Sequence, residues 1–274
     1  HQPRRQRQMC IRDRYKGVSN KNSTMSLPVP MLNIMNGGCH ANNSVDIQEF
    51  MIIPSNKFNF KDGLMKSVEV YTHLKNLLIE KGLSVSVGDE GGFAPNLKTS
   101  EEVLDLIILS IERAGLIYLD DISIALDCAA SELFNKDTYR LTGENKKYSS
   151  EEMVVYIQSL VDKYEIKSVE DPFDETDWNA WKTFTNNNKD LQIVGDDIFV
   201  TQEKILTKGI ESKVANSILI KLNQVGTLSE TMQTISLAKN NGYKTIISHR
   251  SGETEDSFIA CLLYTSDAAD EVDG

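Results

Sequence analysis

Three apolar runs in the middle of the chain each end in carboxylates. The acids are Asp127, the pair Glu170–Asp171 and the pair Asp196–Asp197. If these runs are neighbouring parallel strands, their carboxyl ends converge on one mouth, where three negative charges repel one another unless a cation neutralises them. Carboxylate oxygens suit Mg²⁺, which keeps waters or substrate oxygens as further ligands. The alternative is that each acid only favours the N-terminus of a following helix, and three in succession weaken that alternative.

Basic and anion-binding residue types follow the next two apolar runs. The first of these runs ends in Lys221, and the second is followed by His249, Arg250 and Ser251. A lysine beside a metal and other cations has a lowered pKa, which would free its amine to act as a base; the alternative is a solvated lysine at a strand end. His249 alone is typical of a packed residue. Together the three residues are typical of an anion-binding corner, with the guanidinium of Arg250 on a phosphate.

Three further clusters precede the first of these acids. The stretch 88–92 places Asp89 and Glu90 among three glycines, which indicates either a flexible turn or a functional loop. The stretch 33–40 contains an Asn-Gly pair, typical of a tight turn, and ends in His40. Gln48 and Glu49 stand in an otherwise apolar run, where a charged side chain needs a partner.

The elements that must position these residues alternate between short apolar runs and longer amphipathic ones. The predicted strands are Pro30–Met35, Gln48–Ile53, Ile122–Leu126, Ile166–Val169, Leu191–Val194, Ser217–Ile220 and Lys244–Ile247. The predicted helices are Asp62–Lys81, Glu101–Ala114, Glu151–Tyr164, Asp177–Thr185, Thr201–Glu211 and Thr227–Asn241. From the third strand on, the runs lack strict alternation, which favours parallel strands buried on both faces. A doubly wound sheet and a β/α barrel both fit, and the absence of a GxGxxG motif weakens the dinucleotide-binding version.

Net charge, the length of the apolar runs and the cysteine spacing argue against several classes of protein. The chain has 274 residues, a mass of 30.7 kDa and a formal net charge of −11, which favours one large domain or two small ones and argues against generic nucleic-acid binding. The apolar runs are too short to span a membrane. The four cysteines form no CxxC pair, which is typical of reduced thiols in a cytoplasmic protein.

The two ends of the chain differ from the middle. Residues 1–14 are rich in arginine, residues 261–274 are acidic, and neither continues the adjoining periodicity. A basic targeting arm is one interpretation of the first segment. We expect instead that both are extraneous tails, to be excluded from reasoning about the fold.

Seven motifs in one order resemble the enolase family, and the match runs from about residue 15 to residue 260. They are LPVPMLNIMNGGCHANNSVDIQEFMIIP, VGDEGGFAPNL, ALDCAASE, SVEDPFDE, VGDDIFVT, NSILIKLNQVGTLSET and ISHRSGETED. The resemblance implies an α/β fold, an enolase-type (β/α)8 TIM barrel with ββαα(βα)6 order. On this mapping residues 15–26 form an interdomain segment and 27–260 an incomplete barrel, with the N-terminal α+β domain and the last strand missing.

The resemblance also implies roles for individual residues. The ligands of the first of two Mg²⁺ ions would be Asp127, Glu170 and Asp196. Lys221 would be the base at C2 of 2-phosphoglycerate, and Glu90 the acid at the C3 hydroxyl. Glu49 would support that acid and contact substrate, and His249 would be a catalytic histidine. The substrate-binding residues would be His40, Gln48, Glu49, Lys221, Arg250 and Ser251.

The implied activity is the reversible, Mg²⁺-dependent dehydration of 2-phosphoglycerate to phosphoenolpyruvate in glycolysis, by a cytoplasmic protein that is a homodimer at full length. Lysine bases with Mg²⁺ are a known solution for stabilising the charge that develops when a proton leaves carbon beside a carboxylate. Two alternatives stay open. One is a catalytically silent, incomplete barrel with a binding or structural role, and the other is a different reaction of the wider superfamily, such as racemisation.

Overall fold

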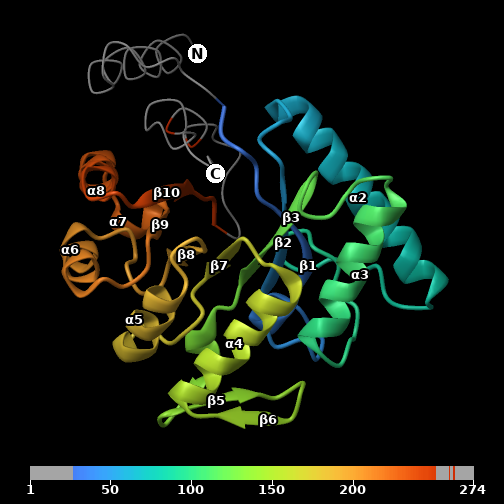
Figure 1. The fold of residues 1–274 in the computed structure, drawn as a ribbon, viewed down its shortest axis with the longest axis horizontal. Coiled ribbons are helices and arrows are strands. Elements are labelled where there is room, and N and C mark those ends of the chain that lie inside the picture. The colour runs from blue at the N-terminus through green and yellow to red at the C-terminus, as the bar shows by residue number, and fades with distance from the viewer. Residues whose placement is uncertain (1–26, 251–258, 260–261, 263–274) are drawn as a thin grey trace.

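The computed structural model describes residues 27–250 together with Ile259 and Leu262. Its main feature is a curled sheet of seven strands with helices around the outside (Figure 1). All seven predicted strands are present, each within two residues of its expected ends: β1 (Leu32–Asn36), β2 (Glu49–Pro54), β3 (Ile122–Asp127), β7 (Ser168–Glu170), β8 (Gln192–Gly195), β9 (Ser217–Ile220) and β10 (Lys244–Ile247). The described part of the chain is therefore an incomplete α/β barrel, as the sequence predicts.

The strand order is β1-β2-β3-β7-β8-β9-β10. Strand β2 runs antiparallel to both β1 and β3, whereas every pair from β3 to β10 is parallel. Strand β2 begins with Glu49, which pairs with Asp127 at the end of β3, and Asp127 pairs with Glu170 at the end of β7. The chain reversal at β2 therefore brings its first residues to the rim where the parallel strands end.

The six predicted helices are also present within two residues of their expected ends: α2 (Phe60–Glu80), α3 (Ser100–Arg113), α4 (Ser150–Tyr164), α5 (Trp178–Asn187), α6 (Glu203–Ser212) and α8 (Leu228–Asn240). Most begin at a side-chain cap, and the clearest is the reciprocal capping box of Ser149 with Glu152. The start of α6 differs from the prediction. Gln202 precedes it without a capping hydrogen bond, because the hydroxyl of Thr201 is buried and bonds instead to Gln224 on another element.

A second sheet is absent from the sequence prediction. It consists of β4 (Phe134–Asn135), β5 (Thr138–Leu141) and β6 (Lys146–Tyr148), and it lies between β3 and α4 in the chain. These strands have two to four residues and mixed polarity, so they give no periodic signal. Two short 3-10 turns (Gly38–His40 and Ala130–Leu133) and the single-turn helix α7 (Leu222–Val225) are also additional.

The hydrophobic core explains why the strands lack alternation. Residues that face opposite sides of the sheet, such as Ile193 and Val194 on β8, are both fully buried because side chains fill the inside of the sheet and helices cover its outside. No helix of the described residues is long and apolar enough to cross a membrane. The expected tails 1–14 and 261–274 and the expected segment 15–26 lie outside the described residues, apart from Leu262, which is buried in the core.

Candidate active site

A cavity of about 870 Å³ opens at the rim where the parallel strands end. Ten of the residues predicted to do chemistry line it: His40, Gln48, Glu49, Glu90, Asp127, Glu170, Asp196, Lys221, His249 and Arg250. They come from positions spread over more than two hundred residues of sequence, so the curled sheet is what brings them together. Ser251 lies outside the described residues.

The three predicted metal ligands lie at neighbouring strand ends. Asp127 ends β3, Glu170 ends β7, and Asp196 directly follows β8; all three are buried. Burial raises the pKa of Asp127 to about 7, aided by the charge of Asp196 and opposed by a hydrogen bond from Ala129. Burial and the charges of Asp127 and Asp196 raise the pKa of Glu170 well above its usual value. Burial and mutual repulsion thus disfavour the charged forms of Asp127 and Glu170, and buried carboxylates of this kind are a donor set that fits a hard divalent cation.

The carboxylates whose oxygens lie closest together at this rim are not the three predicted metal ligands. In the described part of the chain, two groups of three possible metal-binding side chains have their donor atoms within 4.8 Å of one another. One consists of Asp171, Asp196 and Asp197, and the other of His40, Glu49 and Glu90. The predicted set shares the rim but is not one of these groups. Asp196 directs its two carboxylate oxygens to Lys221 and Gln224, which draws it towards β9.

Asp171 gives this part of the rim its backbone geometry. Its φ is +39°, and its buried carboxylate accepts hydrogen bonds from the backbone amides of Asp196 (3.0 Å) and Asp197 (2.7 Å). Asp171 therefore ties the turn after β7 to the turn after β8. The sequence pattern identifies Asp171 as one of the strand-end acids and does not predict this structural role.

Lys221 follows β9 directly, and its ammonium forms an ion pair with Asp196. Its backbone amide donates to the hydroxyl of Thr201 at 3.0 Å, so the buried threonine fixes where the lysine leaves the strand. Burial alone lowers the pKa of Lys221, but the charges of Asp196, Glu170 and Asp127 outweigh it and hold this pKa above its usual value. The lowered pKa that the sequence analysis expects therefore requires positive charge that compensates the acids.

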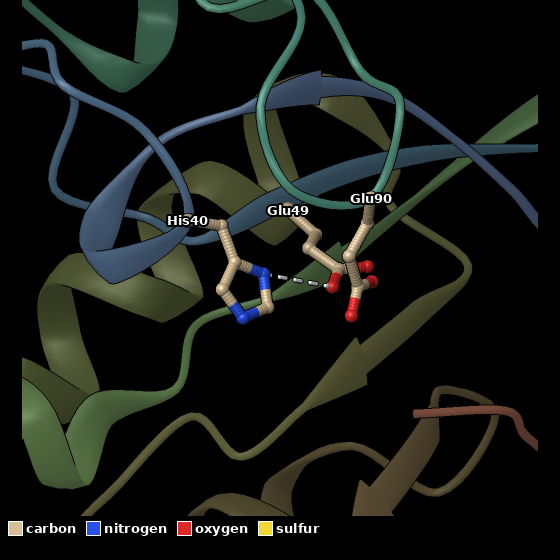
Figure 2. A group of neighbouring side chains, drawn as sticks. All are labelled: His40, Glu49 and Glu90. Atoms are coloured by element: carbon tan, nitrogen blue, oxygen red, sulfur yellow. Dashed lines mark ion pairs between the residues drawn. The ribbon is translucent and has the colours of Figure 1, made fainter. Parts of the chain in front are cut away.

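A second cluster stands on the opposite side of the cavity, since three strands separate β2 from β9. Figure 2 shows His40, Glu49 and Glu90 pointing towards one another from the 3-10 turn, from β2 and from the loop 88–92. Nδ1 of His40 lies 3.5 Å from Oε1 of Glu49. Burial and a hydrogen bond with Glu90 raise the pKa of Glu49 to about 10, so the two carboxyl groups share a proton at neutral pH.

The remaining predicted residues occupy the edges of the cavity. Gln48 donates from Nε2 to Oδ2 of Asp127 at 3.0 Å, which links the carboxyl cluster on β2 to the acidic rim. Nε2 of His249 lies 3.9 Å from Oε2 of Glu90. His249 and Arg250 are exposed at the mouth, where a charged ligand would enter.

Sequence reasoning missed two residues that hold Lys221 and its ion-pair partner Asp196 in place. They are Thr201, which accepts from the backbone of Lys221, and Gln224, which donates to Oδ1 of Asp196 at 3.0 Å. Gln224 lies three residues after Lys221, on the short helix α7, and this proximity was the available signal. The sequence predicts Thr201 only as the first residue of a helix, and its actual contacts depend on the tertiary fold.

Comparisons with known proteins agree with the motifs. Residues 24–270 match the family model described as enolase, C-terminal TIM barrel domain. Curated relatives include proteins named enolase from the Lens, Corby and Paris strains of Legionella pneumophila, each 52% identical over 249 residues. The alignments cover 90% of this chain and 59% of each relative, so the chain spans about three fifths of their length. The family match and the strand order together show that this chain belongs to the enolase C-terminal TIM barrel domain family.

Proposed function

We propose that the protein carrying this chain is a phosphopyruvate hydratase, which converts 2-phosphoglycerate to phosphoenolpyruvate and water and also runs in reverse. The observation that supports this most is the separation of an amine from a proton-bearing carboxyl pair across one cavity. Lys221 stands on one side, and Glu49 with Glu90 stands on the other. Elimination of water needs a base at one carbon and an acid at the hydroxyl on the next.

Asp127, Glu170 and Asp196 would hold Mg²⁺, because they are buried carboxylates at one rim with insufficient compensating charge. When bound, the ion supplies positive charge where negative charge develops on the substrate carboxylate. Neutralisation of these acids also removes the main cause of the raised pKa of Lys221. The amine then titrates closer to neutrality, as a base requires.

Lys221 would take the proton from C2, and the electron pair of the broken C–H bond would delocalise into the neighbouring carboxylate. The C–O bond at C3 then breaks as the C2–C3 double bond forms. Glu90 would deliver its proton to the departing hydroxyl, which leaves as water, and Glu49 would resupply Glu90 through their hydrogen bond. Positioned acid and base groups of this kind contribute about 10²–10⁴-fold each to the rate.

The remaining polar residues would bind substrate. Arg250, with Ser251 beside it in sequence, suits the phosphate, because a guanidinium forks onto phosphate oxygens. His40, Gln48 and His249 line the same cavity as neutral or positive hydrogen-bonding groups. The full-length protein would act in glycolysis in the cytoplasm, as is usual for this family, and would form a homodimer.

The test is turnover of 2-phosphoglycerate by the full-length protein that contains this chain, with Mg²⁺ present. We expect Lys221→Ala to lower kcat by at least about 10³-fold, because it removes the base. Lys204→Ala, which changes an exposed lysine on α6, is the matched control and should behave like the unmodified protein. Near-normal turnover of the Lys221→Ala protein would refute the assignment of the base. Absence of turnover in the unmodified protein would favour the silent barrel.

A further inference from the structure

The loop 88–92 carries Glu90 but belongs to no strand or helix. Its base is closed by a hydrogen bond from the amide of Gly88 to the carbonyl of Gly92 at 2.8 Å. The amide of Asp89 donates to the carbonyl of His40 at 3.1 Å. The position of Glu90 therefore depends on what holds the rest of the loop.

The base of the loop is packed tightly against β1. A side-chain carbon at Gly92 would lie 2.6 Å from Oδ1 of Asn36 and 2.8 Å from the backbone nitrogen of Met35, so only glycine fits there. The tip differs: Gly91 has a φ of +86°, and nothing lies within 4 Å of the place where its side chain would be. Close packing thus fixes both ends of the loop, at Gly88 and Gly92, and leaves the side of the tip at Gly91 open.

Tyr71 of helix α2 reaches this open side. Its hydroxyl donates to the carbonyl of Gly91 at 2.7 Å, immediately after Glu90. Its ring is stacked on Phe93, with centroids 4.3 Å apart and planes within 13°. Phe93 is buried, and its amide donates to Ile34 on β1 at 2.9 Å, so the ring that directs Tyr71 is itself fixed to the sheet.

We infer that Tyr71 is a positioning residue for the acid: its hydroxyl holds the carbonyl of Gly91 and thereby keeps Glu90 against Glu49 and facing the leaving hydroxyl. Tyr71 does not line the cavity, so it acts through the loop and not on the substrate. This inference rests on the proposed function. It adds to the site a residue of helix α2, which otherwise lines the cavity only with Phe60, its first residue.

The stepwise chemistry gives a test that separates positioning from general damage. Proton removal at C2 by Lys221 is measured by uptake of solvent deuterium into 2-phosphoglycerate, whereas loss of water is measured by formation of phosphoenolpyruvate. In the full-length protein, we expect Tyr71→Phe to lower kcat for phosphoenolpyruvate formation by about tenfold, a part of what a positioned acid contributes. The rate of deuterium uptake and the KM should stay within about twofold, because the base and the phosphate site are untouched.

Tyr118→Phe is the matched control, because it removes another tyrosine hydroxyl that donates to a backbone carbonyl, that of Tyr164, away from the cavity. It should leave both rates unchanged. The inference is overturned if Tyr71→Phe slows both rates equally or slows neither. If the unmodified protein shows neither reaction, the proposed function itself fails. Retained deuterium uptake shows that the Tyr71→Phe protein is folded, so the result does not depend on a separate stability argument.

Discussion

At the scale of single residues, Glu49 is a carboxyl group whose ionisation is coupled to folding. Burial and Glu90 raise its pKa from 4.5 to about 10. Below about pH 4.5 the folded and unfolded chains both hold this proton. Between the two values the unfolded chain releases it while the folded chain retains it, so the free energy of unfolding falls as the pH rises.

We therefore expect Glu49→Gln, which cannot ionise, to stabilise this chain increasingly between pH 5 and pH 9. The measurement is the difference in melting temperature between the variant and the unmodified chain across that range. Glu69→Gln, which removes an exposed carboxylate on α2, is the control for loss of a negative charge. If the melting temperatures of all three proteins change with pH in the same way, the raised pKa of Glu49 is contradicted.

Residue types and spacing predicted much of the site, because strand-end acids and the lysine can be placed once the strands are known. The partners of those residues were not predictable in the same way. Asp171, Thr201 and Gln224 act through hydrogen bonds between different turns, and Tyr71 acts from helix α2 through the loop 88–92. Such contacts depend on how elements pack, which a periodic pattern does not encode.

At the scale of elements, the small sheet of β4, β5 and β6 serves to anchor the segment that carries His40. The buried carboxylate of Asp46 accepts from the amides of Gly143 (3.0 Å) and Glu144 (3.1 Å) in the turn between β5 and β6. A side-chain carbon at Gly143 would lie 1.5 Å from the carbonyl of Ser44, so the turn presses directly on this segment. The sequence did not predict this sheet, so it did not predict the hydrogen bonds that connect the sheet to the segment that carries His40.

We expect Asp46→Asn to destabilise the chain by about 1–3 kcal/mol, because an amide cannot accept both hydrogen bonds and leaves a buried donor unpaired. Urea denaturation measures the change. Asp137→Asn, in the exposed turn between β4 and β5, makes the same substitution in the same sheet without these contacts and should alter stability by less than about 0.5 kcal/mol. Equal effects of the two substitutions would contradict the anchoring role.

At the scale of the whole molecule, the chain concentrates negative charge in a buried site while carrying a net charge of −11. An ion that binds the folded state and not the unfolded state raises the free energy of unfolding by about 2.7 kcal/mol at one hundred times its dissociation constant. We expect Mg²⁺ to raise the melting temperature of this chain and a chelator to reverse the rise. Asp196→Asn should abolish most of the shift, whereas Asp190→Asn, at an exposed position, should preserve it. Identical shifts in both variants would place the ion elsewhere.

The anchor at Asp46 also has a consequence for the order in which the molecule folds. Asp46 is separated from Gly143 by 97 positions in the sequence and from Glu144 by 98. Such a contact forms slowly because a long loop must close first. Helix α5 contains both tryptophans of the chain, Trp178 and Trp181, and its first turn closes through local hydrogen bonds. Trp181 is fully buried, so its fluorescence becomes native when the core around α5 has packed, and this signal does not report whether the segment that carries His40 is in place.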